Sequence, residues 1–357
     1  MKKIILTGGG TAGHVTPNLA LVPELEKKGF EILYVGSIKG MEREIVKKAG
    51  VPYIGISAGK PRRYLTIGNI FRNIVDIFRV LKGYRQAKSI IKKEKPDIVF
   101  SKGGFVTVPV VFAAARYNIP VILHESDMTP GLANRLAIKK ATKVCHNFPE
   151  TAKHLGIKAV HTGSPLRAEL FEGDANEAKK LCGFNDDKPV IMVTGGSLGA
   201  ENVNILVRSA LDELLKNYNV AHLCGKGKLD ESLVGKPGYV QFEYISTHMK
   251  DFFAMADLVI SRAGANSICE IAALKKPNIL IPLSKKVSRG DQILNANSFK
   301  KQGISEVLYE DEASKEDLVE LVNKVFDNKD AYIEAMEKAE MTGGVEKIVR
   351  LIRVTAK

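Results

Sequence analysis

The 357-residue sequence lacks any uninterrupted apolar stretch of about 18 residues, so no segment is expected to span a membrane. Its N-terminus also lacks the charged region, apolar region and cleavage site of a secretory signal. Cysteine is scarce: the four cysteines are scattered and have no metal-ligand spacing. These absences lead us to expect a cytoplasmic protein with free thiols.

Acidic residues are too few to balance the basic ones, and the formal net charge is +13. A basic excess of this size indicates contact with nucleic acid, an anionic membrane surface or phosphorylated ligands. The composition, with 45% hydrophobic and 26% charged residues, is otherwise typical of a soluble globular protein. A chain of this length is expected to form about two domains.

A glycine-rich turn follows the first apolar stretch. Gly8, Gly10 and Gly13 come directly after a strand expected at 3–7, with the spacing G-x-G-x-x-G, and a helix is expected just beyond them. Glycine lets the backbone turn tightly and approach a ligand, and the N–H groups at the start of a helix attract anions. The turn therefore predicts a phosphate-binding site.

Strands and helices alternate along both halves of the chain, which is typical of parallel sheets built from strand–helix–strand units. In the first half, strands are expected at 3–7, 31–35, 53–56, 97–101, 121–124 and 143–146. In the second half they are expected at 190–194, 221–223, 240–242, 258–261, 278–281 and 305–308. The turn at 195–199 repeats the strand-to-glycine pattern of the turn at 8–13, so each half has its own candidate anion-binding loop.

We therefore expect an α/β fold with two Rossmann-like domains facing a cleft. Gly163 and Pro165 indicate a hinge, so the first domain is expected to cover 1–163 and the second 164–342. A helix within 343–357 is expected to return to the first domain. Ligands are expected in the cleft between the two halves.

A dinucleotide does not fit the first glycine turn. Such a site requires an acidic residue about 20 residues later, at the end of the second strand, to bind the ribose. Here the basic Lys39 follows that strand instead. A 2′-phosphate could use Lys39, but no dehydrogenase catalytic set follows, and no P-loop motif occurs. We expect no cofactor.

The second half offers a better nucleotide site. The turn at 261–265 leads into a helix that contains Glu270. A carboxylate can accept two hydrogen bonds from a ribose diol, and the N–H groups of the turn can hold a pyrophosphate. The alternative is that Glu270 is a solvated helix residue. Asp291 and Gln292, which follow the next strand, are suited to bind sugar hydroxyls.

Seven motifs, in order, span essentially the whole chain. They are GGTAGH at 9–14, KGGFV at 102–106, HESD at 124–127, GSPLR at 163–167, GGSLGA at 195–200, RAGA at 262–265 with Glu270, and DQ at 291–292 with NA at 295–296. With them the chain resembles the MurG family, cytoplasmic transferases that add N-acetylglucosamine to the lipid-linked muramyl-pentapeptide precursor of peptidoglycan. The resemblance implies a glycosyltransferase B-type fold. It also implies inverting transfer from UDP-N-acetylglucosamine to the muramyl 4-hydroxyl of undecaprenyl-pyrophosphoryl-muramyl-pentapeptide.

The resemblance further implies which residues bind the substrates. The donor would be held by Thr11, Ala12, Gly13, Asp127, Arg167, Ser197, Ile245, Ala265, Asn266, Glu270 and Gln292. Within this set Arg167 and Ser197 would hold the pyrophosphate, because the planar fork of arginine matches phosphate oxygens. The acceptor's pyrophosphate would face Gly10, Gly103 and Gly104. No Asp-x-Asp motif occurs, so helix N-termini and Arg167 would replace a metal ion.

His14 is the candidate general base, since histidine has an ordinary pKa of about 6.5 and this one opens the helix after the first turn. The alternatives are that His14 binds phosphate or substrate, or only caps the helix. Glu125 is the second candidate for the base, or a residue that orients the acceptor. Asp127 departs from the family, which often has Asn there; an ionised Asp could only accept hydrogen bonds from the donor sugar.

Most of the basic excess lies within residues 60–95, which hold eleven Lys/Arg and two acids. Apolar side chains of this stretch cover more than the ~100° arc that packing on a core needs. The pattern indicates a helix on an anionic membrane surface, with Phe71, Arg72, Ile74, Phe78 and Arg79 in contact. A core helix with a solvated basic face is the alternative. No nucleic-acid motif or set of stacking aromatic residues occurs, so nucleic acid is not expected as a partner.

Other functions fit parts of this pattern. A UDP-N-acetylglucosamine 2-epimerase or a diacylglycerol glycosyltransferase would keep the fold, although an epimerase needs no lipid-binding helix. A non-catalytic nucleotide-sugar sensor would keep Glu270 and Arg167 but needs no acceptor loops. We expect a peripheral enzyme at the cytoplasmic face of the bacterial membrane. Its partners would be UDP-N-acetylglucosamine and the lipid-linked acceptor, with other cell-wall synthesis proteins as further candidates.

Overall fold

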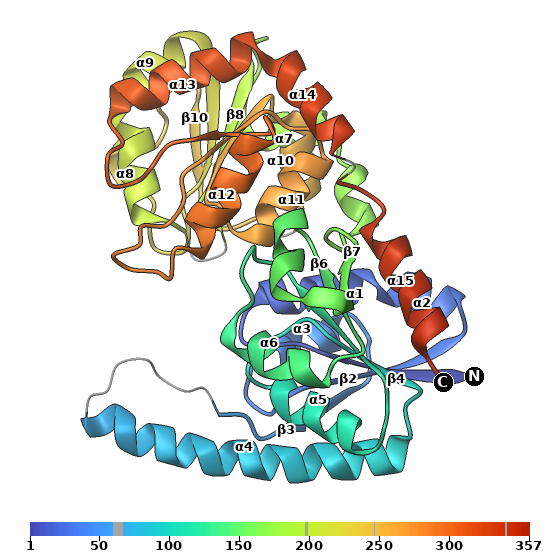
Figure 1. The fold of residues 1–357 in the computed structure, drawn as a ribbon. Helices are drawn as coiled ribbons and strands as arrows, with labels where there is room; N and C mark the ends of the chain where they lie inside the picture. The colour runs from blue at the N-terminus through green and yellow to red at the C-terminus, as the bar shows by residue number, and fades with distance from the viewer. Residues whose placement is uncertain (60–66, 197–198, 246, 340) are drawn as a thin grey trace. The chain divides into compact units, whose positions relative to one another are not determined.

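The structure is a computed structural model that describes residues 1–59, 67–196, 199–245, 247–339 and 341–357, with only the backbone described for 67–74. Its contacts divide the chain into two compact units. The first domain contains Met1–Arg167 and Gly343–Lys357, and the second contains Ala168–Thr342. The division falls a few residues after the hinge expected at Gly163. Both domains are shown in Figure 1.

The first domain is built on a parallel sheet of seven strands in the order β3-β2-β1-β4-β5-β6-β7. The strands are β1 (Lys2–Thr7), β2 (Phe30–Ser37), β3 (Tyr53–Ile56), β4 (Ile98–Ser101), β5 (Val121–Glu125), β6 (Lys143–His146) and β7 (Ala159–His161). Its α-helices are α1 (Thr16–Ala20), α2 (Val22–Lys27), α3 (Glu42–Lys48), α4 (Ile67–Glu94), α5 (Thr107–Arg116), α6 (Leu132–Ala137) and α15 (Gly344–Thr355). Short 3₁₀ turns lie at Ala12–His14, Ile138–Lys140, Pro149–His154 and Gly156–Lys158.

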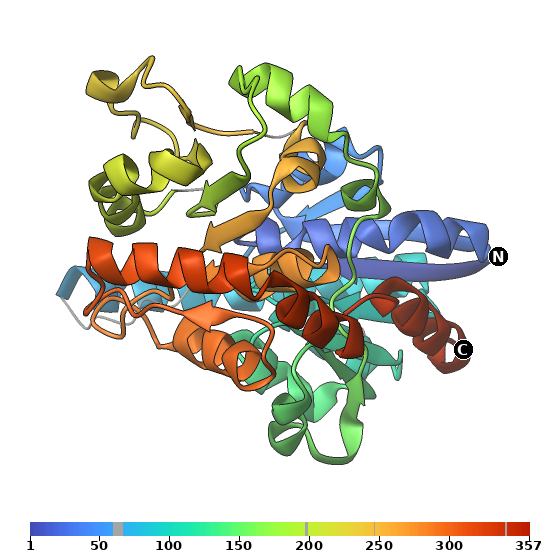
Figure 2. The same cartoon turned by 90° about the horizontal axis from the view of Figure 1, so that it is seen from above.

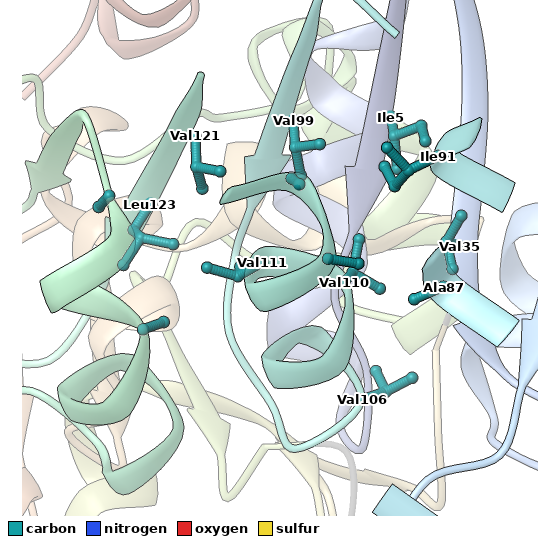
Figure 3. Packing of buried hydrophobic residues seen from close by; sticks show 14 of the residues in the cluster. Ile5, Val35, Ala87, Ile91, Val99, Val106, Val110, Val111, Val121 and Leu123 are labelled. Carbon is teal, nitrogen blue, oxygen red and sulfur yellow. The ribbon is translucent and has the colours of Figure 1, made fainter. Parts of the chain in front are cut away.

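Apolar helix faces cover this sheet because its strands carry buried residues on both faces. On one face, Ala87 and Ile91 of α4 and Val110 and Val111 of α5 pack against strand residues such as Val99 (Figure 3). On the other face, α15 contributes Ile348, Val349 and Ile352 to a second core. Each core extends over several strands, so the strand ends that carry the candidate site are held firmly.

The C-terminal helix belongs to the first domain. α15 packs against α2 and β4, and the two chain ends lie close together in Figures 1 and 2. The Lys2 ammonium donates to the carbonyl oxygen of Ala356 at 3.0 Å. A methyl group added at Gly344 would stand 2.3 Å from the carbonyl oxygen of Ser164, so the chain segments that leave and re-enter the first domain run in contact.

The second domain has a parallel sheet of six strands in the order β10-β9-β8-β11-β12-β13. The strands are β8 (Val190–Thr194), β9 (Asn219–Leu223), β10 (Tyr239–Phe242), β11 (Leu258–Ser261), β12 (Asn278–Leu280) and β13 (Glu306–Val307). The helices are α7 (Ala175–Cys182), α8 (Glu201–Ser209), α9 (Leu211–Asn217), α10 (Met249–Met255), α11 (Ala265–Ala273), α12 (Asp291–Lys301), α13 (Lys315–Asp327) and α14 (Lys329–Lys338). Short 3₁₀ turns lie at Ala168–Phe171 and Glu231–Leu233.

The α/β expectation with two Rossmann-like sheets is confirmed, and every expected strand overlaps an observed one. β7 was not expected, because its three residues give too short an apolar pattern to stand out from the hinge that follows. His14 does not open an α-helix as expected. It ends the 3₁₀ turn Ala12–His14, and α1 begins two residues later.

Candidate active site

The candidate site of the first domain lies at the C-terminal edge of its sheet. β1 has β2 on one side and β4 on the other, and a ligand crevice is typical of the point where strand order reverses in this way. The backbone N–H of Lys102 donates to the carbonyl oxygen of Thr7 at 2.9 Å, so the two glycine-rich turns begin side by side. β5 pairs with β4, which brings the turn after Glu125 to the same edge.

His14 is half-buried in this edge, and its ring is held by the first glycine turn. Its Nδ1 atom lies 3.0 Å from the carbonyl oxygen of Gly9 and 3.3 Å from the hydroxyl of Thr11. Because a carbonyl oxygen can only accept, the proton of the neutral ring belongs on Nδ1, which leaves the lone pair on Nε2. Such a ring can take a proton from a substrate at Nε2.

The pKa of His14 is lowered from its ordinary value of 6.5. Burial is the main cause and the nearby Lys102 ammonium adds to it, while the bond to Gly9 and the carboxylates of Asp127 and Glu42 act in the opposite direction. The imidazole is therefore neutral at physiological pH and ready to accept a proton.

The two glycine-rich turns of the first domain contact each other through their backbones. The N–H of Gly9 donates to the carbonyl oxygen of Gly103 at 3.3 Å. Gly104 has φ +92°, and a methyl group on it would stand 2.2 Å from the Gly9 oxygen. Only glycine allows both the backbone angle and this close approach.

The Gly10 N–H does not point into open space, as a pyrophosphate contact would require. It donates to the carboxylate of Glu42 at 3.3 Å, and Glu42 is only 1% exposed. A phosphate brought to this N–H would meet a buried negative charge. The Gly10 N–H is thus occupied by Glu42, while Gly103 and Gly104 lie just before α5, and the contacts of these three glycines with the acceptor's pyrophosphate stay predictions.

Glu125 fixes the turn that follows β5. Its two carboxylate oxygens accept hydrogen bonds from the N–H of Asp127 at 3.0 Å, the N–H of Gly131 at 3.1 Å and the amide of Asn134 at 2.9 Å. Burial, and then the charge of Asp127, raise the pKa of Glu125 to about 7, although those hydrogen bonds oppose the shift. Its pKa would suit a base, but its oxygens are engaged in holding the turn, which favours an orienting role.

Lys102 and His124 form a buried pair that the sequence reasoning did not select. The Lys102 ammonium contacts Nδ1 of His124 at 2.7 Å and donates to the hydroxyl of Ser126 at 2.5 Å. Nε2 of His124 donates to the carbonyl oxygen of Gly163 at 3.0 Å, so this nitrogen carries the ring proton. Lys102 begins the KGGFV motif and His124 begins the HESD motif. Their contact joins residues that are 22 positions apart, so no local sequence pattern predicts it.

A cavity of about 560 Å³ opens beside these turns. Its lining includes His14 and Glu42, Phe105 and Val106 just before α5, and residues of the turn after β2. Lys39 from that turn and Arg79 from α4 bring positive charge to the lining, and Arg79 also pairs with Asp76. The lining thus carries two basic side chains and one carboxylate among apolar residues.

The second domain repeats this arrangement at the C-terminal ends of β8, β11 and β12. Thr194 pairs with Ser261, and the N–H of Arg262 donates to the carbonyl oxygen of Thr194 at 3.3 Å. The glycine turn after β8 and the turn before α11 therefore lie next to each other. In the glycine turn, Gly196 has φ +81°, while Ser197 lies outside the described residues.

α11 places the expected nucleotide residues in and after its first turn. Its first residue is Ala265, Gly264 precedes it at the cap, and Asn266 follows half-buried. Glu270 lies further along the same helix and is also half-buried. The side chain of Ile245 is buried in the core of the domain, so only its backbone could face a base. The positive end of α11 suits a pyrophosphate.

Gln292 and Asn295 on α12 are tied to the turns of this edge. The side-chain oxygen of Gln292 accepts from the N–H of Leu283 at 3.1 Å, so its NH₂ group is the part of the amide that can donate to a ligand. The amide of Asn295 donates to the carbonyl oxygen of Ala263 at 3.3 Å and so connects α12 to the turn before α11. Asp291, which was expected to bind sugar hydroxyls beside Gln292, pairs with Arg289 at 2.6 Å.

Arg262 and Glu310 form a buried ion pair beneath the same edge. Their side chains meet at 2.5 Å, and a second guanidinium nitrogen of Arg262 donates to the carbonyl oxygen of Ile281 at 3.1 Å. The Glu310 carboxylate also accepts from the N–H of Ser284 at 3.1 Å. The pair thus fixes the turns after β11 and β12. Its role was not expected, because Glu310 lies 48 residues from its partner.

Arg167, the last residue of the first domain before the division, is half-buried. Its Nε atom is buried and has no hydrogen-bond partner within the described part of the chain. A buried guanidinium nitrogen without an acceptor is costly, and a phosphate oxygen would satisfy it. Across the described ranges, no three His, Cys, Asp or Glu side chains gather as a metal site would require.

Residues 4–146 match the glycosyltransferase family 28 N-terminal domain, and residues 190–352 match the glycosyltransferase family 28 C-terminal domain. The chain belongs to glycosyltransferase family 28. The first segment covers six strands of the first sheet, β1 to β6, and the second covers the whole second sheet together with most of α15. The resemblance drawn from the seven motifs is therefore confirmed at the level of the family.

Curated relatives in glycosyltransferase family 28 match over their whole length. The enzyme of Lachnospira eligens named UDP-N-acetylglucosamine--N-acetylmuramyl-(pentapeptide) pyrophosphoryl-undecaprenol N-acetylglucosamine transferase is 59% identical over 358 residues, covering all of both chains. The enzyme of the same name from Clostridium botulinum strain 657 is 59% identical and covers 99% of each chain.

Solved structures with a similar fold include a MurG enzyme. The crystal structure of Acinetobacter baumannii MurG has a TM-score of 0.76 and 26% identity, and the match covers 99% of this chain and 100% of that one. A putative UDP-N-acetylglucosamine 2-epimerase from Listeria monocytogenes has a TM-score of 0.70 at 15% identity, with 99% of this chain and 96% of that chain covered. At that identity the likeness shows a shared fold alone.

α4, the helix expected to contact the membrane in this family 28 chain, is buried toward its C-terminal end and exposed nearer its start. Its C-terminal half packs on the sheet through Ala87 and Ile91. Nearer its start, Ile77, Phe78 and Leu81 are 60%, 66% and 50% exposed. The side chains of Phe71, Arg72 and Ile74 lie outside the described residues. Among the helices that the structure describes, none is long and apolar enough to cross a membrane.

Proposed function

We propose that this chain transfers N-acetylglucosamine from UDP-N-acetylglucosamine to the muramyl 4-hydroxyl of the undecaprenyl-pyrophosphoryl-muramyl-pentapeptide, with inversion at the sugar. The observation that carries the proposal is the 59% identity, over full length, to enzymes named for this transfer. The first domain adds His14, a neutral histidine whose Nε2 can take the proton of an attacking hydroxyl. An epimerase or a sensor has no acceptor hydroxyl and would not need a base for one.

The second domain would bind the donor at the C-terminal ends of β8, β11 and β12. Glu270 would accept hydrogen bonds from the ribose diol, and the start of α11 at Ala265 and Asn266 would face the pyrophosphate. Gln292 keeps its NH₂ group for a hydroxyl of N-acetylglucosamine because its oxygen is held by Leu283. Ile245 would meet the uracil through its backbone, and Ser197 would join the pyrophosphate contacts.

Arg167 would neutralise the departing diphosphate. Its buried Nε without a partner supports this role, because a diphosphate oxygen would supply the missing acceptor. Thr11, Ala12 and Gly13 would approach the donor sugar, and Asp127 would accept from one of its hydroxyls. Charge stabilisation by helix N-termini and an arginine replaces a metal ion in this proposal.

The acceptor's pyrophosphate would lie against the start of α5, next to Gly103 and Gly104. The helix dipole gives this end partial positive charge, and Lys39 and Arg79 bring full charges to the adjoining cavity. The exposed apolar residues of α4 would enter an anionic lipid surface, which keeps the lipid-linked acceptor within reach at the cytoplasmic face of the membrane.

The chemical step is a single displacement. The muramyl 4-oxygen forms a bond to C1 of N-acetylglucosamine while the bond from C1 to the UDP oxygen breaks, and UDP leaves with the electron pair. Nε2 of His14 takes the proton from the attacking hydroxyl. Glu125 would hold the turn that contains Asp127 in place and would not itself take the proton.

Release of UDP from UDP-N-acetylglucosamine tests this function, measured with and without the muramyl-pentapeptide lipid. Release that depends on the acceptor, with a product larger by one N-acetylglucosamine, supports the transfer. Release that ignores the acceptor would refute it, and conversion of the donor to its 2-epimer would establish the alternative. Replacing the lipid by diacylglycerol distinguishes the remaining alternative of the same fold.

A further inference from the structure

The peptide group between Gly9 and Gly10 is hydrogen-bonded on both sides. Its carbonyl oxygen accepts from Nδ1 of His14 at 3.0 Å, and its N–H donates to the carboxylate of Glu42 at 3.3 Å. In a trans peptide the carbonyl and the N–H point in opposite directions, and the described chain has no cis peptide bond. Glu42 and His14 therefore lie at opposite edges of one peptide group.

Glu42 is firmly held at its edge of this peptide group. It is the first residue of α3 and is 1% exposed. Its other carboxylate oxygen accepts from the N–H of Ser37 at 2.9 Å and from the Ser37 hydroxyl at 2.5 Å. Methyl groups added at Gly9 or Gly40 would stand 2.6 Å and 2.2 Å from this carboxylate, so both glycines make room for it.

Glu42 and the contact with Gly104 both hold the Gly9–Gly10 peptide, but without Glu42 its backbone angles would permit it to turn over. It has a glycine on each side, and glycine accepts backbone angles that other residues do not. Turning it over would direct the Gly10 N–H at Nδ1 of His14, which would then have to accept. The ring proton would move to Nε2, the atom that must be unprotonated for base catalysis. The turned peptide would also present its carbonyl oxygen to the Glu42 carboxylate, which repels it.

We propose that Glu42 is a positioning residue for the transfer: through the Gly9–Gly10 peptide it fixes the proton of His14 on Nδ1 and leaves Nε2 as the base. The proposal rests on the base role of His14 given above, but its first consequence, the position of the ring proton, does not. The charged groups facing His14 are Lys102 from the turn after β4, Asp127 from the turn after β5 and Glu42 from α3.

Glu42→Gln tests this directly because it keeps the shape of the side chain. Ser37 presents an N–H, so the new amide keeps its oxygen there and turns its NH₂ toward the glycine turn. An NH₂ group repels the Gly10 N–H and attracts the Gly9 carbonyl, so the peptide turns over. Glu44→Gln is the matched control, since Glu44 is exposed on the same helix and loses the same charge.

The readout is the ¹⁵N chemical shift of each ring nitrogen of His14 in its neutral form, assigned by comparison with His14→Gln. We expect the proton on Nδ1 in the wild type and in Glu44→Gln, and on Nε2 in Glu42→Gln. We expect kcat to fall by about 10²-fold in Glu42→Gln, the size of a lost general base. Glu42→Asp, which keeps the charge but draws it back, should give a mixture of both forms and an intermediate rate.

Three results would overturn the proposal: a wild-type proton on Nε2, an unchanged proton position in both Glu42 variants, or a fall in kcat without any change of proton position. A proton that moves to Nε2 with kcat unchanged supports the positioning by Glu42 and instead refutes His14 as the base. The failure of the positioning and the failure of the base assignment are thus distinguishable. If Glu42→Gln does not fold, Glu42→Asp decides by the same measurement.

Discussion

Gly104 packs against the carbonyl oxygen of Gly9, close enough that a methyl group on Gly104 would stand 2.2 Å from that oxygen. The same oxygen holds Nδ1 of His14 at 3.0 Å. The second glycine turn therefore supports the atom that orients the proposed base. Gly104 is expected to bind phosphate, and it also fixes the peptide that contacts His14.

Gly104→Ala is expected to lower kcat at least tenfold, because the displaced Gly9 carbonyl would release the His14 ring. It should also destabilise the protein by about 1 kcal/mol or more, since alanine is strained at φ +92°. Steady-state kinetics and thermal unfolding measure the two effects. Gly131→Ala is the control: nothing lies within 4 Å of an added methyl group there, and φ is −64°. Equal kcat in both variants would contradict the argument.

The pH dependence of kcat/KM should identify the base. His14 acts as a base only when neutral, and burial lowers its pKa below 6.5, so activity should be constant near neutrality and fall on the acid side below pH 6.5. His14→Ala should lower kcat by about 10²-fold or more and remove this acid limb. Turnover near the wild-type value in His14→Ala would exclude His14 as the base.

Glu125→Ala separates an orienting role from a base role in the same assay. Removing its carboxylate frees the backbone of Asp127 and Gly131, so kcat/KM should fall, but the acid limb set by His14 should remain. Because the pKa of Glu125 is raised to about 7, a base at this position would instead place the limb near neutrality. A limb near pH 7 in the wild type that disappears in Glu125→Ala would favour Glu125.

Patterns in the sequence predicted the strands and the turns that carry both candidate sites. Strand–helix alternation is typical of parallel sheets, and a parallel sheet brings the turns after neighbouring strands to one edge, as the structure shows for the turns at Gly9, Gly103 and Glu125. What the sequence did not predict are contacts between distant side chains and backbone. Glu42 reaches Gly10 across 32 residues, and Lys102 reaches His124 across 22.

These contacts also changed the interpretation of single residues. Gly10 was expected to bind phosphate because the glycine spacing matches a phosphate-binding turn. In the structure, however, its N–H donates to the carboxylate of Glu42 on α3. Glu125 was a candidate base, yet two of its hydrogen-bond donors come from the turn that it holds and the third, Asn134, from α6. Residue type and spacing predict where chemistry occurs, and the hydrogen bonds decide which residue performs it.

α4 gives a prediction about membranes. Phe78 is 66% exposed among basic residues of this helix, so Phe78→Ser should weaken binding to vesicles with anionic lipid by about tenfold, from the lost burial of one aromatic ring. Ile157→Ser is the control, because Ile157 is 96% exposed outside α4. Co-sedimentation with vesicles measures both, and added salt should weaken wild-type binding. Equal losses in the two variants would show that α4 is not the contact.

His222 gives a prediction about stability in acid. It is fully buried between the hydroxyl of Tyr239 and the amide of Asn204, and burial lowers its pKa to about 3. In the unfolded chain its pKa returns to about 6.5, so between these values the unfolded chain holds one more proton and the free energy of unfolding falls with falling pH by about 1.4 kcal/mol per pH unit. His222→Gln should reduce the measured slope between pH 6 and 4 by about this amount, whatever its effect on stability at neutral pH. Urea unfolding at several pH values measures the slope, and substitution of the exposed His154 by Gln provides the control. An unchanged slope in His222→Gln would show that the buried imidazole takes up its proton without unfolding.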